Sequence, residues 1–213
     1  MRALSPVRAG FCPGCGELSE NPDTTPTLCG ACRLSPRPWD ALGFFGPYQG
    51  VLRDCVLGLK FRAHLGLLGL LGGLALHAYQ AGLVRPDGFD PQGPDLVTAV
   101  PVHWGKLIFR GFNQSLELAR LLAQAINRPL CPRVLRKHRR TQAQSRLGFG
   151  QRQANLKGAF TAESRLAEGK SVLVVDDVMT TGATLAEAAR ALRRAGARRV
   201  EVLVLARDLK RGG

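Results

Sequence analysis

Two adjacent aspartates lie between a wholly apolar run and a cluster of threonines. Asp176 and Asp177 follow Val172–Val175 and precede Thr180–Thr184, where three threonines surround one glycine. A helix that begins there offers unpaired backbone N–H groups and a partial positive charge to a phosphate, and threonine hydroxyls add donors. The carboxylates would repel a phosphate, but they accept hydrogen bonds from the two hydroxyls of a ribose. The segment Asp176–Thr184 therefore predicts a binding site for a phosphorylated ribose.

Two other interpretations of this region explain less. An ordinary helix cap accounts for one aspartate or threonine, but not for two acids and three threonines around a glycine. Gly169-Lys170-Ser171 resembles the end of a Walker loop, but Ser164 stands where the first glycine of that loop belongs. A Walker loop also follows a strand, whereas these residues precede the apolar run. The site for a ribose phosphate is therefore the preferred prediction.

Four of the six cysteines form two Cys-x-x-Cys pairs, Cys12 with Cys15 and Cys29 with Cys32. Two such pairs supply the four thiolate ligands of a tetrahedral zinc ion and leave no open position for water. Residues 1–38 contain few large apolar side chains. A segment that cannot build its own hydrophobic core needs a cross-link such as a bound metal ion to stay folded. Redox dithiols or disulfides are the alternatives. The spacing predicts a structural zinc-binding module over residues 1–38.

Basic residues far outnumber acidic ones, with a formal net charge of +14 and a pI of about 10.6. Between Leu118 and Ala162 there is no Asp or Glu. A solvated basic face is one explanation, but such faces usually mix both signs, so the stretch favours a surface that meets the phosphates of nucleic acid. Aromatic residues, at 6%, offer little base stacking. The side chains expected to contact nucleic acid are Arg136, Lys137, Arg139, Arg140, Arg146 and Arg152.

The elements that must position these residues alternate between strands and helices. The expected strands, short and apolar, are Leu96–Val102, Val172–Val175 and Val200–Leu205. The expected helices are Val51–Leu59, Leu65–Gly82, Asn113–Ile126 and Ala183–Ala195. Strand–helix–strand order predicts a parallel α/β sheet, and ligands of such sheets bind at the carboxyl ends of the strands.

No stretch of the sequence predicts insertion into a membrane. The most apolar one, Leu65–Leu76, has 12 residues, whereas a membrane-spanning helix needs about 20. Met1–Gly10 lacks the apolar run of a signal peptide. We therefore expect a cytoplasmic protein, in which paired cysteines rarely mean disulfides.

Val172–Leu185 resembles the signature of the type I phosphoribosyltransferases that binds phosphoribosyl pyrophosphate (PRPP). Further motifs narrow the resemblance to the ComF (ComFC/GntX-like) competence family and occur in the family's order along nearly the whole chain. They are the two Cys-x-x-Cys pairs, Val100-Pro-Val102, Arg110-Gly-Phe-Asn-Gln-Ser115, Thr141-Gln-Ala-Gln144, Arg152-Gln-Ala-Asn-Leu156 and Gly158-Ala-Phe160. The resemblance implies a type I phosphoribosyltransferase-like domain over residues 39–213, a parallel sheet flanked by helices, after a small zinc-ribbon-like module over residues 1–38.

The resemblance also implies roles for individual residues. PRPP would be bound by Asp176, Asp177, Val178, Met179, Thr180, Thr181, Gly182, Ala183 and Thr184, with Arg110 and Arg152 at its pyrophosphate. A basic segment that closes over the site would include Arg139, Gln144, Arg152 and Asn155. Mg²⁺ would accompany PRPP and neutralise the pyrophosphate.

The family is linked to natural transformation, so the resemblance implies a protein of DNA uptake. It would bind PRPP and single-stranded DNA, beside a helicase or another partner of the uptake machinery. A working phosphoribosyltransferase is the alternative, in which Asp176 and Asp177 hold the ribose during transfer to a base or amine. A regulatory protein that senses PRPP without turning it over is the third possibility. The sequence leaves open whether the protein is an enzyme.

Overall fold

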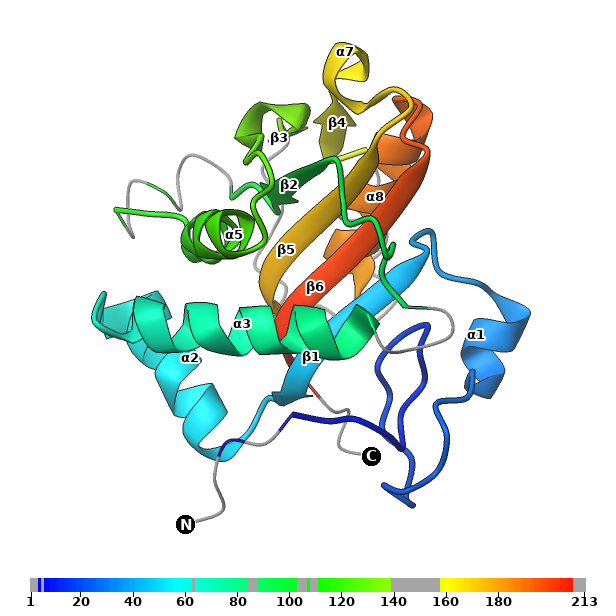
Figure 1. Ribbon diagram of the computed structural model, residues 1–213, viewed down its shortest axis with the longest axis vertical. Coiled ribbons are helices and arrows are strands. Elements are labelled where there is room, and N and C mark those ends of the chain that lie inside the picture. Colours follow the sequence, from blue (N-terminus) through cyan, green and yellow to red (C-terminus); the bar gives the residue numbers. More distant parts are fainter. Residues whose placement is uncertain are drawn as a thin grey trace.

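A four-stranded parallel sheet forms the centre of the protein. The computed structural model describes residues 4, 6–62, 64–83, 88–102, 107, 111–138 and 158–208. The strands are β1 (Ala41–Pro47), β2 (Leu96–Ala99), β5 (Ser171–Met179) and β6 (Arg199–Arg207). They lie in the order β1-β6-β5-β2, and every neighbouring pair is parallel (Figure 1). The predicted parallel sheet is confirmed.

Helices cover both faces of this sheet because its strands are apolar on both sides. Alternate strand residues, such as Val172 and Val174, belong to a core that includes the apolar face of α8 (Ala183–Arg194). The intervening residues Leu173 and Val175 face a second core. Three helices build that second core, α2 (Gly50–Arg62), α3 (Leu67–Leu83) and α5 (Gln114–Ala125) (Figure 1).

Shorter elements surround the sheet. They are the helix α1 (Gly30–Leu34), the 3-10 turn η1 (Pro132–Val134), the helix α7 (Ser164–Ala167), and the antiparallel pair β3 (Leu135–Lys137) and β4 (Phe160–Ala162). The pair β3–β4 packs against α8. Among the described residues, no helix is long and apolar enough to cross a membrane.

Strand β5 extends further than its sequence indicates, because β6 pairs with it throughout. Asp176 lies opposite Val204, and Met179 lies opposite Arg207. On the other side, β2 ends at Ala99, opposite Val175, rather than at the predicted Val102. The two aspartates are therefore strand residues with only one paired edge, and the connection to α8 is reduced to residues 180–182.

The N-terminal segment packs directly on the sheet. The rings of Phe11 and Phe44 meet edge to face at 5.3 Å between centroids, and both residues belong to the core that includes α8. The backbone N–H of Val7 donates to the carbonyl of Phe45. These contacts join residues on the two sides of residue 38, where we predict a domain boundary. The boundary itself stays a prediction.

Candidate functional site

The two aspartates of β5 contact the beginning of α5. The Ser115 hydroxyl donates to Asp176 Oδ1 at 2.7 Å, and the Gln114 amide donates to Asp177 Oδ2 at 3.0 Å. Asn113 fixes this helix end, because its side chain accepts from the Ser115 N–H and donates to the carbonyl of Val100. The start of α5 therefore occupies the space beside β5 that a longer β2 would have filled.

A lysine from the distant helix α2 completes the contacts of Asp177. Lys60 Nζ lies 3.2 Å from Asp177 Oδ2, and both side chains are largely buried. Burial acts to raise the pKa of Asp177, but the Lys60 ammonium and the Gln114 amide outweigh it, so the pKa lies below its ordinary value. Asp177 is therefore ionised at neutral pH.

Asp176 has the opposite electrostatic character. Burial, and then the charge of the neighbouring Asp177, raise the pKa of Asp176 to about 7. The hydrogen bond from Ser115 opposes this rise without cancelling it. Two adjacent carboxyl groups with separated pKa values, one charged and one near neutrality, are typical of functional sites.

Replacing Asp176 with asparagine should stabilise the protein, and more at pH 8 than at pH 5. A carboxyl group whose pKa is higher in the folded state costs stability as the pH rises between the unfolded and folded values, from about 4 to about 7. The full shift corresponds to about 4 kcal/mol, and partial exposure reduces the expected gain at pH 8 to about 1–2 kcal/mol. Asparagine Oδ1 can keep both hydrogen bonds that Asp176 Oδ1 accepts, from Ser115 and from the Asp177 N–H.

Urea unfolding at the two pH values measures this gain. Asp54→Asn, at an exposed acid of α2, is the control and should change stability little at either pH. An equal or larger gain for Asp176→Asn at pH 5 would contradict the assigned pKa.

The loop after β5 makes a sharp turn at Gly182. This residue has φ +76°, a conformation that other L-residues rarely adopt. A Cβ atom here would lie 3.2 Å from the Trp39 ring and 3.3 Å from Met179 Sδ. The turn leads directly into the first turn of α8, and the Thr181 hydroxyl accepts from the Ala183 N–H. The predicted helix start at Ala183 is confirmed, and the Trp39 ring lies against the turn that precedes it.

The four cysteines of the two Cys-x-x-Cys pairs lie together, with their Sγ atoms all within 4.8 Å of one another. Cys15 Sγ and Cys29 Sγ are 3.7 Å apart, close to the edge of about 3.8 Å expected for a tetrahedron with Zn–S bonds of about 2.3 Å. A hydrogen bond from Cys15 lowers the pKa of Cys12 to about 4, and the Cys29 N–H also donates to Cys12 Sγ. The donor set and its spacing fit a metal ion such as zinc.

A buried arginine joins this cysteine cluster to the loop after β5. Arg207, the last residue of β6, is 3% exposed. Its guanidinium donates to the carbonyl of Cys15 at 2.8 Å and to the carbonyl of Met179 at 3.2 Å, and also to the carbonyls of Thr180 and Asp208. It forms an ion pair with Glu17 at 3.1 Å. Trp39 makes a second connection, because its indole N–H donates to the carbonyl of Gly14.

The structure describes most of the residues that the sequence singles out. Asp176–Thr184 form one continuous strand end, loop and helix start, and Arg136 and Lys137 lie on β3, where Arg136 is exposed. Outside the described residues lie Arg110, Arg139, Arg140, Gln144, Arg146, Arg152 and Asn155.

The sequence did not indicate a role for Lys60, Trp39 or Arg207. Gln114 and Ser115 belong to the motif Arg110–Ser115, but the motif alone indicates no role for them. For Lys60 and Arg207 no local spacing gives a signal, since Asp177 lies 117 residues from Lys60 and Cys15 lies 192 residues from Arg207.

Comparison with known proteins agrees with this architecture. Residues 113–213 match the family model described as the phosphoribosyl transferase domain. DNA utilization protein YhgH of Salmonella typhimurium is 35% identical over 206 residues, which cover 95% of this chain and 86% of the relative. Competence protein F of Haemophilus influenzae is 28% identical, covering 92% of this chain and 85% of the relative. Competence protein ComFC of Bacillus subtilis is 26% identical, covering 91% and 75%. The chain therefore belongs to the ComF/YhgH family, with a type I phosphoribosyltransferase domain whose parallel sheet is flanked by helices.

Proposed function

We propose that this protein acts in the use of incoming DNA and binds both PRPP and single-stranded DNA. The observation that carries the PRPP part is the pair of aspartates held by α5 beside the glycine turn into α8, within the matched phosphoribosyl transferase domain. The DNA part is supported by the names of the relatives, DNA utilization protein and competence protein, and by the net charge of +14.

In this proposal the ribose hydroxyls donate to Asp176 and Asp177, and the 5-phosphate lies at the start of α8, where the N-terminus is partially positive. Arg110 and Arg152 contact the pyrophosphate, which Mg²⁺ neutralises when bound. The Gln114 Oε1 atom is buried, and the described residues provide it with no hydrogen-bond partner. A buried acceptor of this kind beside two carboxylates supports a site that a ligand or its bound water completes.

Single-stranded DNA would lie along the basic surface that includes Arg136 and Lys137, together with Arg139, Arg140, Arg146 and Arg152 in the acid-free stretch. Neutralisation of phosphates by such side chains makes binding strong at low salt and weak at high salt. A helicase or another component of the uptake machinery, and a cytoplasmic location, stay predictions.

A second candidate function is transfer of ribose 5-phosphate from PRPP to a base or amine. The observation that favours it is the pKa of Asp176, raised to about 7, because a carboxyl group near neutrality suits proton transfer. The acceptor nitrogen would form a bond to the anomeric carbon while the bond to pyrophosphate breaks. The acceptor nitrogen would give its proton to the Asp176 carboxylate, and the pyrophosphate would leave with Mg²⁺.

Calorimetric titration with PRPP and Mg²⁺ tests the proposal. The wild-type protein should bind, and the double variant Asp176→Asn/Asp177→Asn should bind tenfold to a hundredfold more weakly, because the ionised Asp177 and the partly ionised Asp176 both become neutral amides. Asp23→Asn/Asp54→Asn, at two exposed acids, is the charge-matched control and should bind like the wild type. The double variant at 176 and 177 should keep its affinity for single-stranded oligonucleotides.

Three results would decide between the candidates. Failure of the wild-type protein to bind PRPP would overturn the PRPP site. Release of pyrophosphate with an acceptor, abolished in the Asp176→Asn/Asp177→Asn variant, would support the transferase. Binding without release would support a protein that senses or uses PRPP as a ligand.

A further inference from the structure

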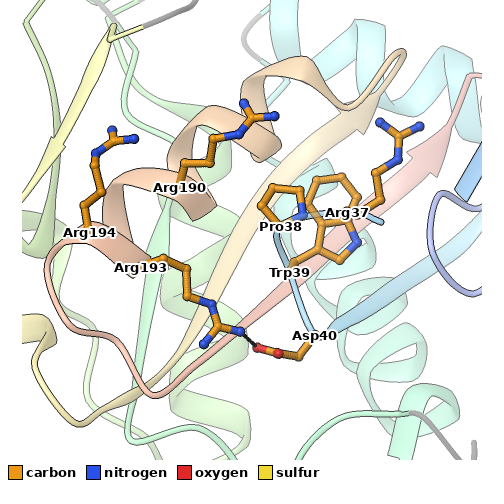
Figure 2. Close-up of a pocket in the computed structure, with 7 residues that line it drawn as sticks. All are labelled: Arg37, Pro38, Trp39, Asp40, Arg190, Arg193 and Arg194. Atoms are coloured by element: carbon orange, nitrogen blue, oxygen red, sulfur yellow. Dashed lines mark hydrogen bonds and ion pairs between the residues drawn. The ribbon is translucent and has the colours of Figure 1, made fainter. Parts of the chain in front are cut away.

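A pocket of about 400 Å³ lies between α8 and the segment that leads into β1. Figure 2 shows Trp39 in the centre, with side chains of α8 on one side and Arg37 on the other. We call it the arginine pocket, and its lining residues are Arg37, Pro38, Trp39, Asp40, Arg190, Arg193 and Arg194.

The single acid in the arginine pocket is already neutralised. Asp40 is paired with Arg193 and also accepts from the Val200 N–H at 2.7 Å. Arg193 in turn donates to the carbonyl of Arg198 at 2.7 Å, so its guanidinium is held in place. The pocket therefore carries excess positive charge, which comes from its other arginines.

Arg190 and Arg194 carry charge that the protein leaves accessible. Their side chains are 51% and 58% exposed, and both pair with one carboxylate, that of Glu187, at 3.1 and 3.7 Å. Glu187 is itself buried and also accepts from the Gly158 N–H at 2.9 Å. One carboxylate shared by two arginines and a backbone donor cannot neutralise both guanidiniums, so these arginines can engage an external anion.

The arginine pocket combines these charges with an apolar wall. Trp39 and Pro38 form that wall, and the Arg37 guanidinium lies 5.9 Å from the centre of the Trp39 ring. Trp39 is only 6% exposed, so this wall offers little area for base stacking, and the arginines are the groups that would contact a nucleic acid. Arg190 and Arg194 are four residues apart on α8, a rise of about 6 Å, on the scale of the spacing between successive phosphates in an extended strand.

The arginine pocket also adjoins the rest of the basic surface. Gly158, whose N–H donates to Glu187, lies two residues before the start of β4, and the pair β3–β4 packs against α8. Strand β3 carries the exposed Arg136. A nucleic acid strand that leaves the arginine pocket can therefore continue toward Arg136 on β3.

We propose that the arginine pocket binds the backbone phosphates of single-stranded nucleic acid, with Arg190 and Arg194 as the contacting side chains. This inference rests on the proposed function and adds the place where the strand binds. Arginine suits the role because its planar guanidinium contacts two phosphate oxygens at once.

Fluorescence anisotropy with a labelled oligothymidylate tests the site. Arg190→Gln/Arg194→Gln should weaken binding about tenfold or more at low salt. It should also reduce the slope of log affinity against log salt by about 1.4, since each phosphate contact contributes about 0.7. The matched control is Arg120→Gln/Arg53→Gln, which removes two arginines of 51% and 53% exposure with ion pairs of 3.0 and 3.9 Å. The control should change affinity about twofold or less.

A second set of variants controls for misfolding of the first double variant, because the loss of both arginines leaves the buried Glu187 carboxylate without a cation. Glu187→Gln/Arg190→Gln/Arg194→Gln removes that carboxylate as well, and Glu117→Gln/Arg120→Gln/Arg53→Gln is its counterpart. Selective loss in the first triple variant, with unchanged thermal unfolding and PRPP binding, supports the site. Equal loss in both triple variants, or none in either, overturns it. A wild-type protein that binds no oligothymidylate would instead refute the DNA part of the proposed function.

Discussion

Arg207→Met is expected to lower the free energy of unfolding by about 3 kcal/mol or more, because buried backbone acceptors lose their donor. The guanidinium donates hydrogen bonds to the carbonyls of Cys15, Met179 and Thr180 and forms an ion pair with Glu17. Methionine keeps the apolar stem but satisfies none of these carbonyls. The cysteine module and the loop after β5 would lose the side chain that joins them.

Urea unfolding of the variant measures this loss. Arg120→Met makes the same exchange at a half-exposed arginine whose partner is Glu117 on the same helix, and it should cost less than about 0.5 kcal/mol. Glu17→Gln should also have a small effect, since Glu17 is 40% exposed and the carbonyl contacts remain. If Arg207→Met lowered the free energy of unfolding no more than Arg120→Met does, the contacts of Arg207 would contribute no stability.

Removal of metal from the four-cysteine cluster should have the other large effect. We expect about one zinc ion per chain, because four thiolates close a tetrahedral site. Apparent binding energies of structural zinc are about 10–16 kcal/mol at neutral pH, so its loss should unfold the segment around Cys12–Cys32. The sheet should stay folded but lose thermal stability, because Phe11 belongs to its core and Arg207 donates to the carbonyl of Cys15.

Two measurements, of zinc release and of Trp39 fluorescence, test for the metal. A chelator should release zinc and expose four thiols to a thiol reagent, and Cys12→Ser/Cys15→Ser should bind about one tenth of the zinc or less. In a Trp104→Phe background the fluorescence of Trp39 should change on chelation, because its indole N–H donates to Gly14 between the first two cysteines. Cys55→Ser/Cys131→Ser is the control and should bind zinc normally. A purified protein free of zinc that keeps its Trp39 fluorescence and thermal stability would contradict a structural metal site.

Much of the fold and part of the site could be predicted because the relevant signals are local. The run Val172–Val175 is apolar on both faces, which is typical of a central parallel strand, and β5 lies between β2 and β6. Two Cys-x-x-Cys pairs close together in the sequence predict a four-thiolate metal site, and their Sγ atoms do lie together.

The remaining features depend on the register and length of neighbouring strands. That Asp176 and Asp177 belong to β5 follows from the equal extension of β6 and the early end of β2. Neither limit can be read from the residues around the aspartates. Lys60 shows the same difficulty, because only the packing of α2 brings its ammonium to Asp177. Long-range placement of this kind has no signature in a single sequence.

The place of Arg207 also constrains the order in which the protein can be completed during translation. A ribosome makes Cys15 first and Arg207 192 residues later, and β1, among the described strands, pairs only with β6. Until β6 emerges, the nascent cysteine module has no guanidinium to dock against, and β1 has no neighbour. The edge strand β1 and the metal-binding segment therefore stay exposed to chaperones and proteases until β6, the last strand of the sheet, has been synthesised.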